Sequence, residues 1–137
     1  ANHATTDPLP NTPEHQVLLQ VALGDHQVSN FAADIEARTI GAHLHCPAFA
    51  PERVPGTLVG WGIRCIDSYP YGGSAIVYFD SGADLPLLTN TPPTGGHDPH
   101  SDPRSDPAAR MQKSAFLSPE GQLIDVCDAG PCTAAQD

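Results

Sequence analysis

Two apolar runs of strand length stand out along the chain, at residues 17–23 and 74–80. Both are apolar at nearly every position rather than at alternate positions, which is typical of a strand covered on both faces of a parallel sheet. Each run is followed closely by a glycine that can turn the chain, Gly24 after the first and Gly82 after the second. The pattern therefore predicts two core strands in a parallel sheet.

Two other segments have the spacing of helices. Residues 31–40 place apolar side chains at helical intervals, Ser29 or Asn30 can cap their start, and Gly41 can end them. A second helix is expected to begin at Pro107, because proline is favoured at the first helical position. A strand followed by a turn and a helix is half of a βαβ crossover. We therefore expect an α/β fold with two core strands, two main helices and long loops.

The 137 residues are enough for one domain with a modest core, and we expect a single domain, residues 1–137. Its composition changes along the chain and divides it into four parts. These are a surface entry segment at 1–15, a strand and helix at 17–41, an irregular excursion at 42–73, and a strand, His-rich loop, helix and Cys loop at 74–132.

The chain is acidic, with a formal net charge of −10 at pH 7. Nucleic-acid binding draws most of its affinity from basic side chains that neutralise phosphates, so this balance argues against a nucleic-acid partner. No apolar run approaches the roughly 20 residues that a membrane-spanning helix needs. We therefore expect neither nucleic acid nor a membrane span.

Four cysteines, an even number, favour disulfides and an oxidising compartment, so we expect a secreted or periplasmic protein. Cys127 and Cys132 lie in one short loop that can close on itself, which would leave Cys46 to pair with Cys65. The distance between two cysteines and the orientation of their side chains in the fold can rule out either pairing. The alternative is a zinc site made by all four cysteines, although their spacing does not form two close Cys-x-x-Cys knuckles.

Ionisable side chains follow both predicted strands. Asp25 comes directly after the first strand, and His97 and His100 lie in the loop after the second. Because the carboxyl ends of parallel strands meet at one edge of a sheet, these groups are expected to share a crevice there. A carboxylate that accepts the Nδ1 proton of an imidazole fixes its tautomer, and the other ring nitrogen can then take a proton from a serine.

The stretches VLLQVALGDHQVSNFAADIEARTIG, SAIVYFD, GGHDPHSDPR and RMQKSAFLSPEGQLIDVCDAGPC carry a family resemblance. Over residues 17–132 the chain resembles the C-terminal region of secreted bacterial α/β-hydrolase-like proteins of the serine esterase or lipase type. The resemblance implies that Asp25 is the acid of a catalytic triad and His100 its histidine, with His97 as the alternative. The competing interpretation is that Asp25 only caps a turn and that the histidines are solvated loop residues.

The chain departs from this family in one respect, since no Gly-x-Ser-x-Gly motif occurs in it. Ser74 opens a predicted strand, whereas the nucleophile of these enzymes lies on a strand-to-helix turn. The resemblance thus implies a processed subunit or an isolated fragment. A second polypeptide chain would carry the nucleophilic serine and the remaining strands, and the substrate would be a small ester or lipid, with no cofactor.

Two further hypotheses remain open from the sequence. The first is a non-catalytic extracellular binding or assembly module that associates with copies of itself through an exposed sheet edge. The second is a metal site. Imidazoles and carboxylates that could hold zinc or copper are His43, His45, His97 and Asp98, and carboxylates that could hold Ca²⁺ are Asp84, Asp98, Asp102 and Asp106.

Overall fold

The structure, a computed structural model, describes residues 2–53 and 59–137. Parts of two predicted segments, the entry segment 1–15 and the excursion 42–73, therefore lie outside the described residues. The elements are η1 (Asn2–Ala4), β1 (Leu18–Ala22), α1 (Asn30–Ile40), β2 (His43–Leu44), η2 (Pro51–Arg53), β3 (Ala75–Asp80), η3 (Pro99–Ser101), α2 (Asp102–Ser105), α3 (Pro107–Phe116) and β4 (Cys132–Thr133).

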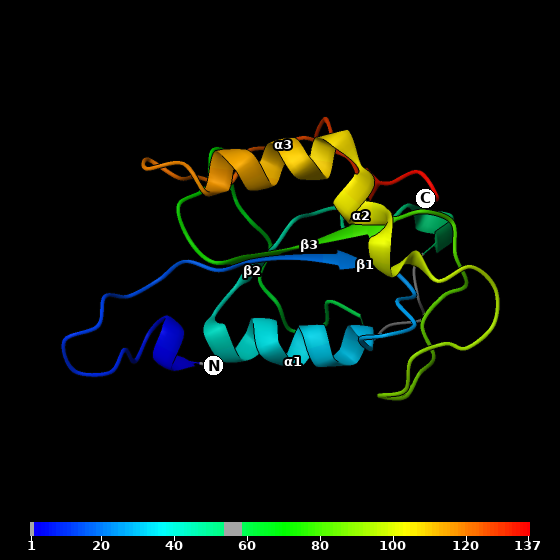
Figure 1. Cartoon of the computed structure of the whole chain (residues 1–137), viewed down its shortest axis with the longest axis horizontal. Coiled ribbons are helices and arrows are strands. Elements are labelled where there is room, and N and C mark those ends of the chain that lie inside the picture. Colours follow the sequence, from blue (N-terminus) through cyan, green and yellow to red (C-terminus); the bar gives the residue numbers. More distant parts are fainter. Residues whose placement is uncertain (1, 54–58) are drawn as a thin grey trace.

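The sheet is parallel and centred on β3 (Figure 1). β1 pairs with β3 along its whole length, and β2 lies on the other side of β3. β4 pairs with the carboxyl end of β3, where Phe79 is opposite Cys132. A small parallel sheet with a few helices confirms the α/β prediction in this coarser form. The strands β2 and β4 were not predicted, because two residues are too few to show a periodicity.

β3 is buried on both faces, which explains why its sequence is apolar at successive positions. Ile76 and Tyr78 pack into one core cluster together with α1, and Val77 and Phe79 pack into a second cluster with α3. Figure 1 shows the resulting layers, with α1 on one side of the sheet and α3 on the other. Parallel sheets covered in this way require apolar side chains on both faces.

Local signals in the sequence set the ends of both main helices. Ser29 caps α1 by accepting a hydrogen bond from the N–H of Ala32, and Gly41 ends it in a left-handed conformation with φ of 69°. Asp106 caps α3 through the N–H of Ala109. These are the ordinary roles of Ser, Asp and Gly at helix ends.

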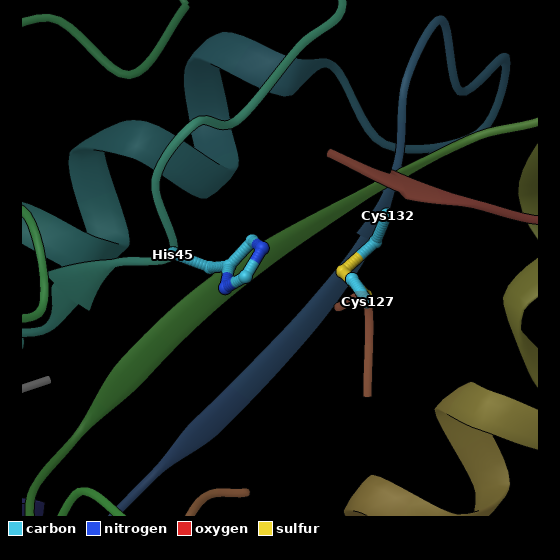
Figure 2. A group of neighbouring side chains, drawn as sticks. All are labelled: His45, Cys127 and Cys132. Carbon is cyan, nitrogen blue, oxygen red and sulfur yellow. A yellow bond between two sulfur atoms is a disulfide. The ribbon is translucent and has the colours of Figure 1, made fainter. Parts of the chain in front are cut away.

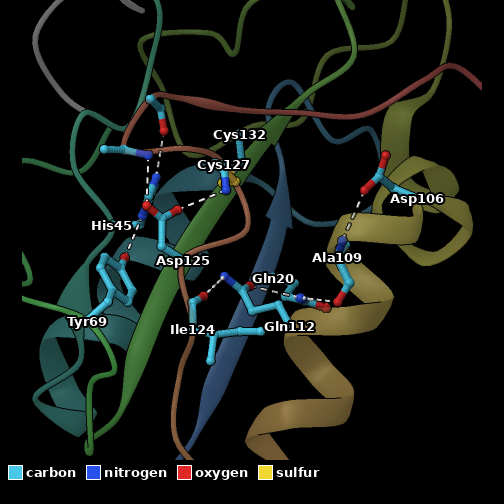
Figure 3. Close-up of a disulfide and its surroundings, with 12 residues drawn as sticks. Gln20, His45, Tyr69, Asp106, Ala109, Gln112, Ile124, Asp125, Cys127 and Cys132 are labelled. Carbon is cyan, nitrogen blue, oxygen red and sulfur yellow. Dashed lines mark hydrogen bonds between the residues drawn. A yellow bond between two sulfur atoms is a disulfide. The ribbon is translucent and has the colours of Figure 1, made fainter.

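Gln20 is the one polar residue within β1, and it joins the strand to α3 (Figure 3). Its side-chain N–H group donates to the carbonyl of Ala109 at 2.8 Å and to Oε1 of Gln112 at 3.0 Å. The fully buried Gln112 in turn donates to the carbonyl of Ile124 at 3.2 Å. A buried amide is costly unless its polar atoms have partners, and this network supplies them.

The four cysteines form two disulfides, Cys46–Cys65 and Cys127–Cys132. The alternative of a zinc site made by four thiolates is therefore wrong, since no cysteine is free to ligate a metal. Two disulfides are consistent with a protein from an oxidising compartment. Among the described residues, no helix has both the length and the apolar character needed to cross a bilayer.

The excursion is anchored to the sheet by an ion pair at the carboxyl end of β3. Arg53 of η2 donates to both carboxylate oxygens of Asp80, at 2.7 Å and 2.8 Å. Burial alone would raise the pKa of Asp80, but the hydrogen bonds from Arg53 and from the N–H of Gly82 outweigh it and lower the pKa. A carboxyl group with a lowered pKa stabilises the fold at pH values above its unfolded pKa.

This ion pair predicts a pH-dependent stability. We expect Asp80→Asn to have a lower free energy of unfolding than the wild type near neutral pH, and the gap to close as the pH falls below the unfolded pKa of about 3.9. Urea denaturation over a pH series measures the gap. Asp67→Asn is the matched control, because Asp67 pairs with Arg64 at the surface and exposed pairs contribute little. A gap for Asp80→Asn that stays constant with pH would contradict this expectation.

Candidate active site

The carboxyl end of β1 is a tight turn defined by Gly24 and Asn30. Gly24 has a φ of 84°, and a Cβ atom there would lie only 2.1 Å from the carbonyl oxygen of Asp84. The Asn30 side chain accepts a hydrogen bond from the N–H of Gly24 and donates one to the carbonyl of Ala22, both at 2.8 Å. The turn therefore fixes the backbone immediately before Asp25.

Asp25 is buried and directs one carboxylate oxygen at His100. Its Oδ1 atom accepts hydrogen bonds from the backbone N–H groups of Gln27, at 2.7 Å, and Val28, at 2.9 Å. Its Oδ2 atom lies 2.8 Å from Nδ1 of His100. The side chains are 7% exposed for Asp25 and 18% for His100, so solvent weakens this contact only in part. The structure thus brings together two predicted residues that are 75 positions apart.

His100 lies in the short helix η3 rather than in an irregular loop, and Asp98 caps that helix. Asp98 accepts hydrogen bonds from the N–H of His100 and from both the side chain of Gln27 and the N–H of His26. The hydrogen bond from Gln27 is the main cause that lowers the pKa of Asp98. Asp98 therefore links the segment that carries Asp25 to the one that carries His100.

The hydrogen bonds of His100 assign its tautomer. An ionised carboxylate only accepts hydrogen bonds, so Nδ1 carries the proton that faces Asp25. Nε2 lies 2.7 Å from a guanidinium nitrogen of Arg104, which can only donate, so Nε2 is the acceptor. A neutral imidazole with its lone pair on Nε2 is the form that a general base needs. In this structure Arg104 occupies that lone pair.

His97, the alternative triad histidine, has a different carboxylate partner. Its Nε2 atom lies 2.9 Å from Oδ2 of Asp102, which is 1% exposed. Burial raises the pKa of Asp102, but hydrogen bonds to its carboxylate, including those from His97 and the N–H of Asp137, lower it overall. The structure therefore contains two separate Asp–His pairs, and Asp25 belongs with His100.

Two hollows adjoin Asp25 and His100, and both lie along β1. One, of about 300 Å³, is on the side of α1 and is lined mainly by apolar side chains: Leu18, Leu19, Val21, Val28, Ala32 and Ala33. The other, of about 260 Å³, is on the side of α2 and α3 and includes Arg104 and Lys113 in its lining. The Asp–His pair is therefore accessible to a small ligand from both sides of the strand.

No serine among the described residues is hydrogen-bonded to His100. Ser74, the serine considered in the sequence, lies immediately before β3, and its hydroxyl accepts a hydrogen bond from the N–H of Val17 at 3.1 Å. It is thus at the amino end of the sheet, whereas Asp25 follows the carboxyl end of β1. The described part of the chain thus supplies a carboxylate and an imidazole, without a serine hydroxyl hydrogen-bonded to that imidazole.

The proposed metal ligands are not gathered into one site. In the described part of the chain, the one group of three ligand atoms close enough to share an ion comes from His45, Cys127 and Cys132 (Figure 2). His97 is paired with Asp102, and Asp98 and Asp106 act as helix caps. The ligands predicted for zinc, copper and calcium therefore do not gather into one site among the described residues.

The three residues in Figure 2 already form other bonds. Its two cysteines are joined in a disulfide. The His45 ring contacts the hydroxyl of Tyr69 at 2.5 Å and the carbonyl of Gly130 at 2.8 Å (Figure 3). Burial and the charge of Asp125 raise the pKa of Tyr69 to about 12, so its phenol keeps its proton and donates to Nδ1. His45 therefore fastens the Cys127–Cys132 loop to the excursion.

Three positioning residues were not identified from the sequence. The sequence pattern indicates Asn30 only as a helix cap, although its side chain also holds the turn before Asp25. The cap made by Asp98 and the contact of Arg104 with His100 were not predicted either. The signal for Arg104 was present, because residues four apart face each other on a helical turn.

No family model, no curated protein and no solved structure matches the chain. The function of the chain is therefore inferred from the geometry of its residues and from the motifs described above.

Proposed function

We propose that this chain is the C-terminal part of a secreted serine hydrolase of the α/β-hydrolase type that cleaves an ester or related acyl bond. The observation that supports the proposal most is the 2.8 Å contact between Oδ2 of Asp25 and Nδ1 of His100. It lies where β1 and the loop after β3 meet, and carboxyl ends of parallel strands are where α/β enzymes place their reactive groups.

In the proposed reaction Asp25 orients His100 and stabilises the imidazolium. Nε2 of His100 takes the proton of a serine hydroxyl while the serine oxygen attacks the ester carbonyl. The same Nε2 then gives that proton to the departing alcohol, which leaves an acyl-serine. A water molecule, deprotonated by His100 in turn, releases the acid and restores the serine.

The serine is proposed to come from a different chain or segment that docks beside β1. Among the described residues β1 pairs only with β3, so its other edge is open to a further parallel strand. Unpaired strand edges are normally protected, which supports a partner at this one. A strand added there would run alongside β1 toward Asp25 and His100.

Labelling with a fluorophosphonate tests the proposal. The probe reacts with an activated serine, and it should be applied both to the purified chain alone and to the protein isolated with whatever chain or segment accompanies it naturally. We expect no label on residues 1–137 alone and a serine label on the accompanying chain or segment. His100→Ala should abolish this label, because no base then remains to deprotonate the serine.

His97→Ala is the matched control, since it removes the other imidazole of an Asp–His pair close by in the sequence. It should leave labelling within a few-fold of the wild type. A complex that stays unlabelled with intact His100, or a label that persists in His100→Ala, would overturn the proposal.

The open edge of β1 also favours a second candidate function, self-association without catalysis. Light scattering of the purified chain separates the two. A stable oligomer that contains only this chain and takes up no label supports assembly, whereas a monomer that becomes labelled with a serine-bearing partner supports hydrolysis.

A further inference from the structure

Cations are scarce in this chain, which has six basic residues against sixteen acidic ones. Arg53 and Arg64 each pair with an aspartate, and Arg38 donates to a backbone carbonyl. Among the described residues, the basic side chains without a carboxylate partner in any ion pair or hydrogen bond are Arg38, Arg104, Arg110 and Lys113. Arg104, Arg110 and Lys113 are exposed, and exposed cations need no partner, so the informative feature is where these side chains lie.

Two of these four cations, Arg104 and Lys113, line the same hollow beside His100. Arg104 and Lys113 both border the cavity of about 260 Å³ that also contains Asp25 and His100, whereas Arg110 does not. A water molecule takes up about 30 Å³ in the liquid, so the space is large enough for a small organic ligand. The charge of Asp25 is already engaged by His100 and by two backbone N–H groups.

Two like charges in one hollow repel each other, and an anion between them would relieve that repulsion. A guanidinium is well suited to a carboxylate, which it can bind through two parallel hydrogen bonds. We infer that the substrate of this site carries a carboxylate group, and that Arg104 and Lys113 bind it next to His100. The inference rests on the proposed function, because it names the substrate class of the same site.

Arg104 also connects recognition of the substrate to the state of His100. Its guanidinium donates to Nε2 of His100 at 2.7 Å and so occupies the lone pair that must receive the serine proton. A carboxylate is a stronger partner for a guanidinium than a neutral imidazole nitrogen is, because both groups then carry charge. The bound carboxylate therefore draws Arg104 away and frees Nε2. Arg104 is a specificity-determining and positioning residue in this scheme.

Binding is tested first, without any catalysis. Monomethyl succinate and methyl butyrate are both methyl esters of acids with four carbons, and only the former carries a free carboxylate. In NMR titrations of the purified chain we expect monomethyl succinate to bind at least tenfold more tightly and to shift the His100 ring signals. Arg104→Gln should remove about tenfold of this affinity, the usual scale for one charged hydrogen bond. Arg110→Gln, equally exposed but outside the hollow, should leave it unchanged.

Catalysis is tested second, in the preparation that takes up the fluorophosphonate label. The ratio of kcat/KM for mono-4-nitrophenyl succinate to that for 4-nitrophenyl butyrate should fall about tenfold or more in Arg104→Gln and stay constant in Arg110→Gln. Arg104→Lys, which keeps a charge but not the planar fork, should give an intermediate ratio. Equal thermal melting curves show that the variants are folded.

The two proposals fail in different ways. Carboxylate binding that depends on Arg104, without hydrolysis in any preparation, would overturn the proposal of a hydrolase. The proposal of an anion site would then stand. Hydrolysis that depends on His100 but has no preference for the charged ester, in wild type or Arg104→Gln, would overturn the anion site and leave the hydrolase in place.

Discussion

Asp25→Asn is expected to slow fluorophosphonate labelling of the partner serine by about 10⁴-fold, the loss that the same change of the triad aspartate causes in serine proteases. The amide nitrogen of the variant can donate to Nδ1 of His100, which Asp25 never does. The ring then carries its proton on Nε2 and cannot accept the proton of the serine. Stopped-flow or gel-based labelling rates measure the effect, and circular dichroism checks that the variant is folded.

Asp102→Asn is the matched control, because Asp102 forms the other Asp–His pair. It is expected to change the labelling rate by no more than a few-fold. The opposite result, with Asp102→Asn inactive and Asp25→Asn active, would transfer the role of general base to His97. If both variants kept the labelling rate of the wild type, neither carboxylate would orient the base.

The contact between Asp25 and His100 illustrates what a sequence can predict about a site. Both residues follow apolar runs that the structure confirms as parallel strands, β1 and β3. The rule that parallel strands present their carboxyl ends at one edge was enough to place a carboxylate and an imidazole side by side. It was not enough to choose between two histidines three positions apart, because that choice depends on the turn of η3 and its cap Asp98.

Other features were not predictable because they depend on residues far apart in the sequence or on strands too short to show a periodicity. Gln20 interrupts an apolar strand because its partners are Ala109 and Gln112, about ninety positions away along the chain. β2 and β4 contain two residues each, and they form because the backbone groups of β3 pair with them. Neither case has a local signal, since tertiary contacts override strand propensity in such short segments.

The spacing of the histidines also did not predict their partners. His43 and His45 alternate along the chain, which made them candidates for a shared metal. The structure instead stacks the ring of His43 on Tyr71 and gives both nitrogens of His45 protein partners. Spacing alone does not distinguish a metal ligand from a buried imidazole that serves as a hydrogen-bonding bridge, because both need two defined directions from the ring.

Asn30→Ala is expected to have the second large effect, on stability and on the site together. The change leaves two backbone groups at the turn before Asp25, the N–H of Gly24 and the carbonyl of Ala22, without their partner. Asn30 is 2% exposed, so water does not replace it, and each unsatisfied group costs about 1–3 kcal/mol. We expect urea denaturation to show a loss of about 2–6 kcal/mol in the free energy of unfolding, given those two costs.

Ser29→Ala is the control for this variant, because it removes the cap of the same helix and the hydrogen bond from Ser29 to Asn90 but leaves the turn intact. It should cost only about 1 kcal/mol, the usual contribution of a cap. If Asn30→Ala were no more destabilising than Ser29→Ala, the turn would be held by its backbone alone. Asp25 would then reach His100 without the help of Asn30, and NMR signals of the His100 ring would be the same in Asn30→Ala as in the wild type.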